Sequence, residues 1–171
     1  MTSPHYSASH LLALAAWLMP NNAKMVEDMQ EICNAHAEQQ ILLASEQADE
    51  INPWDIIDPW VSLTRQLESH KQIAIFDWKT TPEDLRWLLD SIGISERTTA
   101  TFWEWHRPDE WRCFFAREQL QAVGKHLRAY GYALAYFETD DVAVMIVPLE
   151  HAPKLVELAQ KSGYGRVEIW G

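Results

Sequence analysis

Three aspartates follow segments that the sequence pattern predicts to be strands. Asp77 ends a short apolar run, and Asp140 with Asp141 separates two longer ones. The ends of neighbouring strands can converge, so these carboxylates and His106 are candidates for a divalent-metal site or for acid–base catalysis. The alternative is that they are ordinary turn residues, because aspartate in a turn hydrogen-bonds to its own backbone. Their spacing in the sequence does not settle how far apart they lie.

Tryptophan is unusually frequent, with nine among the 171 residues. An irregular insert at residues 94–114 combines several indole rings with carboxylates. Aromatic faces beside carboxylates bind lysine or arginine through combined cation–π and charge attraction. The candidate partner-binding residues are therefore Trp103, Glu104, Trp105, Asp109, Glu110 and Trp111. The alternative is that the rings fill the core, as we expect for Trp17, Trp60 and Trp87 on predicted helix faces.

The motifs that mark common catalytic sites are absent from the sequence. There is no HExxH, GxSxG, GxGxxG or P-loop motif, and the six glycines are too dispersed to cradle a phosphate. We therefore predict no cofactor and no bound metal, and the balance is against an enzyme. Cys33 and Cys113 have no paired spacing, which favours two buried, inert thiols in a cytoplasmic protein.

The net charge of −11 is concentrated in the N-terminal part of the chain. Residues 1–70 carry two basic and ten acidic side chains, a net charge of −8, whereas residues 71–171 carry twelve and fifteen, a net charge of −3. A negative field repels phosphate backbones, so we predict no nucleic-acid partner and favour a basic protein partner. The alternative is that the acidic residues serve solubility alone.

Hydrophobic periodicity predicts helices throughout residues 1–70. The apolar run 11–19 is far shorter than the roughly 20 residues of a membrane-spanning helix, so we predict no membrane partner. An amphipathic helix with an acidic outer face is predicted from residue 21 to about residue 48. The pair Asp58-Pro59 predicts the start of a further helix, because proline is tolerated in the first helical turn.

The rest of the chain alternates between strand and helix periods. Residues 72–171 are predicted to form strand, helix, insert, helix, strand, strand, helix and strand. If the two helices around the insert form one crossover, this order is βαββαβ, the signature of the ferredoxin-like arrangement, with helices on one face of an antiparallel sheet. We therefore predict one α+β domain over residues 1–171. Its core at 71–171 would follow a helical acidic extension at 1–70 that packs on the sheet.

Two segments of this core resemble a bacterial family of unknown function. They are residues 75–87, which contain IFDWK and PEDLRW, and residues 131–142, which contain GYAL and TDDV. The resemblance covers about residues 70–163 and leaves the N-terminal helices outside. It implies a bacterial origin and a compact domain of helices and strands, and it transfers no catalytic residue.

Three functional hypotheses remain open. The leading one is a protein-binding module for a basic partner, for instance an immunity-type toxin neutraliser, which acts through the acidic helices or the tryptophan-rich insert. The first alternative is a small metal-assisted enzyme that uses Asp77, His106, Asp140 and Asp141. The second is a structural or oligomer-forming domain, which would expose a large apolar patch repeated across a two-fold axis.

Overall fold

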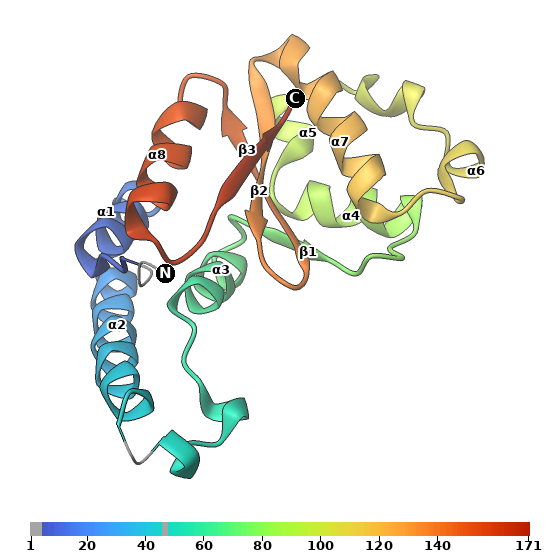
Figure 1. Ribbon diagram of the computed structural model, residues 1–171. Helices are drawn as coiled ribbons and strands as arrows, with labels where there is room; N and C mark the ends of the chain where they lie inside the picture. The colour runs from blue at the N-terminus through green and yellow to red at the C-terminus, as the bar shows by residue number, and fades with distance from the viewer. Residues whose placement is uncertain (1–4, 46–47) are drawn as a thin grey trace.

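A four-stranded antiparallel sheet forms the centre of the computed structural model, which describes residues 5–45 and 48–171 (Figure 1). The strand order is β1-β3-β2-β4. The strands are β1 (Ala74–Phe76), β2 (Tyr132–Glu138), β3 (Val142–Pro148) and β4 (Val167–Trp170). Helices cover both faces of the sheet, and this combination confirms the predicted α+β class.

The two central strands form the predicted hairpin. Their register runs from Tyr132 opposite Pro148 to Glu138 opposite Val142, so residues 139–141 make the turn. Side chains of β2 and β3 alternate between two separate apolar clusters, one on each face of the sheet. Burial on both faces explains why these segments are continuously apolar instead of alternating with polar residues.

Four helices form the layer on one face of the sheet. They are α1 (Ala8–Leu18), α2 (Ala23–Leu43), α3 (Pro59–Ser69) and α8 (Ala152–Ser162). The indole of Trp60 in α3 stacks on Phe137 of β2, with 5.5 Å between the ring centroids. The N-terminal helices therefore pack on the sheet, as the sequence predicts. Helix α2 ends at Leu43, earlier than predicted, and two 3₁₀ turns follow, η1 (Ala48–Glu50) and η2 (Pro53–Asp55).

The layer on the other face is built from α4 (Pro82–Ser91) and α7 (Ala116–Leu127), which η4 (Arg128–Tyr130) extends. The insert between these two helices holds three short helical turns: α5 (Ile94–Arg97), η3 (Phe102–Trp105) and α6 (Pro108–Trp111). Pro108 occupies the first turn of α6. Its ring fixes a backbone angle that suits a helix, and the backbone N–H that proline lacks would have no helical partner at this position.

The order of the strands differs from the predicted ferredoxin-like arrangement. β1 runs parallel to β2 with β3 between them, and β3 runs parallel to β4 with β2 between them. The connection from β1 to β2 and the connection from β3 to β4 cross the sheet in the same direction. They start from β1 and β3, which are antiparallel to each other. Because such crossovers are right-handed, their helices must lie on opposite faces. The prediction that the helices share one face was therefore wrong.

Local capping signals set the starts of three helices. The side chains of Asn22, Asp58 and Thr81 accept hydrogen bonds from backbone N–H groups in the first turns of α2, α3 and α4. These N–H groups have no helical carbonyl partner, so the caps replace the missing bonds. The start of α3 agrees with the sequence prediction, and α2 begins within two residues of its predicted start.

The lengths and polarities of the helices can be compared with those of a membrane-spanning helix. Within residues 5–45 and 48–171, no helix is both long and apolar enough to span a membrane. The apolar helix α1 has 11 residues, and the 21-residue helix α2 carries charged side chains along its length.

Candidate protein-binding groove

A groove of about 850 Å³ opens between α2, α3 and the β2–β3 turn. We call it the acidic groove. Its lining consists of Asp28, Glu31, Ile32, Ala35, Ile56, Ile57, Asp58, Val61, Ser62 and Asp140. It therefore combines apolar side chains with carboxylates that come from three separate parts of the chain.

Helix α2 contributes one wall of the acidic groove. Its side chains at Met25, Met29, Cys33 and His36 are buried against the rest of the protein. Asp28, Glu31, Ile32 and Ala35 form the neighbouring stripe, because residues three and four apart lie on the same side of a helix. The heptad-like spacing thus places two acids and two apolar side chains beside α3.

The segment before α3 forms the floor of the groove, and Gln39 of α2 holds it in place. The Gln39 amide nitrogen donates to the carbonyl oxygen of Asp55 at 2.9 Å, and its amide oxygen accepts from the backbone N–H of Ile57 at 2.7 Å. These two bonds hold the segment against α2. The side chain of Ile56 stays 46% exposed, which is unusual for isoleucine.

Helix α3 supplies the opposite wall. The Asp58 carboxylate accepts from the backbone N–H groups of Trp60 at 2.8 Å and Val61 at 3.1 Å. This cap fixes the carboxylate at the edge of the groove, and the positive end of the helix favours its charge. One turn into α3, the side chain of Val61 remains 39% exposed beside it.

The β2–β3 turn completes the rim because two contacts tie it to α3. The indole N–H of Trp60 donates to the carbonyl oxygen of Glu138 at 3.0 Å. Arg65 forms an ion pair with Asp141 at 3.3 Å. Between these anchors, Asp140 lies exposed on the groove.

The acidic groove has little positive charge to balance its rim. Of Asp28, Glu31, Asp58 and Asp140, only Asp28 has an ion pair within the described part of the chain, with Lys24. Burial lowers the pKa of His36 behind the groove, although the charge of Asp58 opposes this shift. His36 is therefore neutral at pH 7 and does not compensate the carboxylates. Such a surface suits an apolar side chain flanked by lysine or arginine.

Comparison with known families places almost the whole chain in one of them. The model of a domain of unknown function, DUF6630, matches residues 10–169. The chain belongs to the DUF6630 family. No curated protein and no solved structure matched it significantly.

The DUF6630 match covers more of the chain than the resemblance seen in the sequence, which covered about residues 70–163. It includes α1, α2 and α3, so the expectation that the N-terminal helices lie outside the family was wrong. Every residue of the acidic groove lies within the matched range. The groove is therefore part of the DUF6630 domain itself.

The proposed metal or acid–base residues do not gather in one site in this DUF6630 domain. The pairing of Phe76 with Val142 brings Asp77 and Asp141 to the same end of the sheet. There, Asp77 accepts a bond from the backbone N–H of Lys79 at 2.8 Å, and Asp141 pairs with Arg65. Among the described residues, no three His, Cys, Asp or Glu side chains are grouped so that they could hold a metal ion.

His106 lies inside the layer formed by α4, α7 and the insert. Its ring is fully buried, Nδ1 accepts from Arg86 Nε at 3.1 Å, and Nε2 lies 3.1 Å from Gln119 Oε1. Since Gln119 Oε1 can only accept, the ring carries its proton on Nε2. Burial lowers the pKa of His106, and the positive charge of Arg86 acts in the same direction. This neutral histidine links two helices and does not face solvent.

The indole rings of the tryptophan-rich insert surround His106. Trp103, Trp105 and Trp111 are each half-buried. Trp105 stacks on His126 of α7 with 3.9 Å between centroids, and it meets Trp111 edge-to-face at 5.7 Å. These contacts are mostly internal to the insert and its supporting helix.

The carboxylates of the insert face solvent. Asp109 pairs with Arg112 at 3.4 Å, Glu110 pairs with Arg107 at 3.4 Å, and Glu104 is exposed. Cys113 is also exposed, so the expectation that both thiols are buried holds only for Cys33. The exposed acids and the mostly internal rings do not form one apolar and acidic hollow comparable to the acidic groove.

The sequence patterns did not predict the exposure of Trp87 and Ile56. Trp87 was expected in the core but is 69% exposed, whereas Trp60 is buried as predicted. A signal was present, because Trp87 lies midway between the buried Leu85 and Leu89 and so on the opposite side of α4. The apolar floor of the acidic groove had no comparable signal, since Ile56 and Ile57 belong to an irregular segment.

Proposed function

We propose that this protein is a binding module for a basic protein partner and that the acidic groove is its docking site. The observation that carries the proposal is the combination of an exposed apolar floor with carboxylates on both walls. An apolar side chain of the partner would pack on Ile56 of the floor, between Ile32 and Val61 of the two walls. Lysine or arginine side chains on either side would meet the rim.

The charge distribution supports a basic partner. The N-terminal 70 residues carry a net charge of −8, and their helices form two sides of the groove. A field of one sign accelerates the approach of an oppositely charged protein and disfavours nucleic acid. Neutralisation of a toxin, as expected from the sequence, would be one use of such binding.

The size of the groove limits what enters it. A volume of about 850 Å³ suits a few side chains and not a whole protein face. A stable complex buries more than about 1,000 Å² in total, so the groove would form the centre of a wider contact. Partner residues that fill it are expected to dominate the affinity.

Reversal of the rim charge tests this proposal. We expect the double variant Glu31→Lys, Asp140→Lys to bind an amphipathic lysine–leucine helical peptide more than tenfold more weakly than the original protein. Both side chains are exposed, so the fold is expected to survive. Isothermal titration calorimetry at two salt concentrations measures the affinity, which falls as salt screens the rim charges.

A matched control separates the acidic groove from the tryptophan-rich insert. The double variant Glu104→Lys, Asp109→Lys makes the same change in net charge on the rival surface, and there we expect less than a twofold change. If the insert variant loses binding and the groove variant keeps it, the docking site is the insert. Equal losses in both variants would show that net charge alone attracts the peptide.

A further inference from the structure

Strand β4 is an edge of the sheet whose outer side has no strand partner within the described residues. The N–H of Glu138 donates to the carbonyl oxygen of Arg166 at 3.0 Å, just before β4 begins. Hydrogen-bonded and non-hydrogen-bonded residues alternate in an antiparallel pair. Glu168 and Trp170 therefore direct their backbone groups toward β2. Val167 and Ile169 direct theirs outward.

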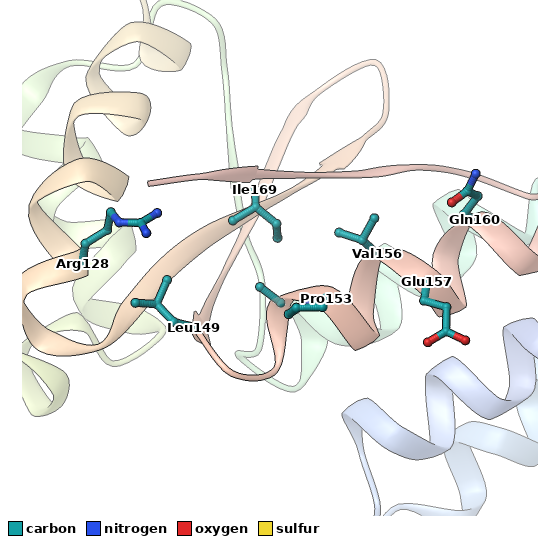
Figure 2. Close-up of a pocket in the computed structure, with 8 residues that line it drawn as sticks. Arg128, Leu149, Pro153, Val156, Glu157, Gln160 and Ile169 are labelled. Atoms are coloured by element: carbon teal, nitrogen blue, oxygen red, sulfur yellow. The ribbon is translucent and has the colours of Figure 1, made fainter.

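A trough runs beside this free edge, and its part next to Ile169 is apolar. Figure 2 shows Ile169 of β4 facing Val156 and Pro153 of α8, with Leu149 and Arg128 toward one end. This hollow measures about 640 Å³. A second hollow of about 960 Å³ shares Val156 and Gln160 with it and continues along Arg166 and Val167. The two together form what we call the β4 trough, which follows the whole strand.

Arginine side chains mark both ends of the β4 trough. Arg128 is exposed at the end near Leu149 and has no ion pair or side-chain hydrogen bond to any other described residue. Arg166, at the other end, is also exposed, and its side chain has no ion pair or hydrogen bond to another described residue. Glu157 already pairs with Lys154 and Lys161 of its own helix. A cation without an acidic partner among the described residues thus lies at each end of the trough.

We propose that the β4 trough binds an extended peptide segment, which adds to β4 as a further strand. Its backbone pairs with the outward N–H and C=O groups of Val167 and Ile169. Its alternate apolar side chains pack on Val156 and Ile169, because successive side chains of a strand point to opposite faces. A carboxylate of the segment meets the guanidinium of Arg128.

Charge favours such a peptide over a second copy of this chain. If β4 paired with β4 of another copy, the only carboxylate in the added strand would be that of Glu168. That carboxylate is already held by Arg117 at 3.1 Å. A second copy would therefore leave Arg128 without a partner. The β4 trough is also separate from the acidic groove in its lining residues, so this proposal does not depend on the proposed function.

A designed peptide provides the test. The probe is a nine-residue acetylated and amidated peptide in which valine alternates with threonine and glutamate occupies both ends. We expect its binding to slow amide hydrogen exchange at Val167 and Ile169 at least tenfold, as measured by NMR. The same peptide with lysine at both ends is expected to bind at least tenfold more weakly.

Two variants separate the charge from the backbone contact. Arg128→Glu is expected to weaken binding at least tenfold, whereas Lys125→Glu, an equal charge change one turn earlier on α7, is expected to change it less than twofold. Ile169→Pro removes an outward N–H without removing a ladder bond to β2, and proline is tolerated at such edge positions. We expect it to abolish binding while the acidic-groove affinity persists.

Four results would overturn the proposal. One is unchanged exchange at Val167 and Ile169 with millimolar peptide. Another is equal binding by the Arg128→Glu and Lys125→Glu variants. The third is a dimer in analytical ultracentrifugation that Ile169→Pro converts to a monomer, which would show that a second copy occupies the β4 trough. The fourth is loss of peptide binding in the Glu31→Lys, Asp140→Lys variant, which would place the peptide in the acidic groove.

Discussion

Replacement of Gly124 with alanine is expected to lower the free energy of unfolding by roughly 3 kcal/mol. This sign is opposite to the usual effect, since alanine in a helix interior is more stable than glycine by about 1 kcal/mol. The added Cβ would lie 2.2 Å from the carbonyl oxygen of Trp170, a backbone atom of β4. Relief of the clash requires α7 to move away from β4. Chemical denaturation measures the change, and the melting temperature should fall by roughly 6 to 12 °C for a chain of this length.

The control for Gly124→Ala is the replacement of an alanine with glycine in the same helix. Ala122→Gly, two residues earlier, is expected to lower stability by about 1 kcal/mol through helix propensity alone. Opposite exchanges two residues apart in one helix would then both destabilise the protein. If Gly124→Ala raised the stability instead, α7 and β4 would not approach as closely as the structure shows.

Truncation of His106 to alanine is expected to lower the free energy of unfolding by roughly 3 to 5 kcal/mol. The change leaves a cavity between α4, α7 and the insert, and it removes the hydrogen-bond partner of Arg86 Nε and of Gln119 Oε1. It also removes the ring that Trp103, Trp105 and Trp111 contact. Because the insert depends on this ring, its tryptophan fluorescence should shift toward the value of exposed indoles. Denaturation followed by fluorescence and by circular dichroism measures both effects.

The same residue is expected to make stability depend on pH. Burial holds the pKa of His106 in the folded protein below the unfolded value of about 6.5. The unfolded state therefore takes up the proton first as the pH falls. The stability contribution is fully present above about pH 6.5 and is lost as the pH decreases toward the folded-state pKa. His36 and His126 have lowered pKa values for the same reason and add to this loss.

The variant His106→Gln isolates this contribution. Glutamine keeps an amide donor for Gln119 but does not titrate. Below about pH 6.5, its unfolding free energy should depend on pH less steeply than that of the original protein, by up to one proton or about 1.4 kcal/mol per pH unit. Identical slopes would mean that His106 is accessible to solvent in the folded state.

Part of the candidate site was visible in the sequence before folding. The acidic face of α2 and the cap at Asp58 both follow from local patterns, and they supply three of the four rim carboxylates. Asp140 was singled out for a different chemistry, as a metal or acid–base residue. Its place on the rim depends on Trp60 and Arg65, which contact the β2–β3 turn across 78 and 76 positions of the chain. The hydrophobic periodicity of a single helix carries no information on contacts between residues so far apart in the chain.

In the tryptophan-rich insert, too, the sequence identified the residues, but only the tertiary structure decided their role. Residue type alone could not tell a docking surface from a packed cluster, because an indole ring suits both. The outcome depends on Arg86, His106 and Gln119, which hold the insert between two helices. Trp87 and Trp60 illustrate the point, since one is exposed and the other buried although both lie on helices that begin with proline.

The sequence by itself determined the α+β class, the helix starts at capping residues, the hairpin of β2 and β3, and the acidic character of the N-terminal helices. These features arise from bonds and periods between residues close together in the chain. Only the tertiary structure decided the strand order, the faces that the helices cover, the acidic groove and the free edge of β4. Strand order depends on pairing between distant segments, and the right-handedness of the crossovers then assigns α8 and α7 to opposite faces. The groove and the edge exist because of that arrangement.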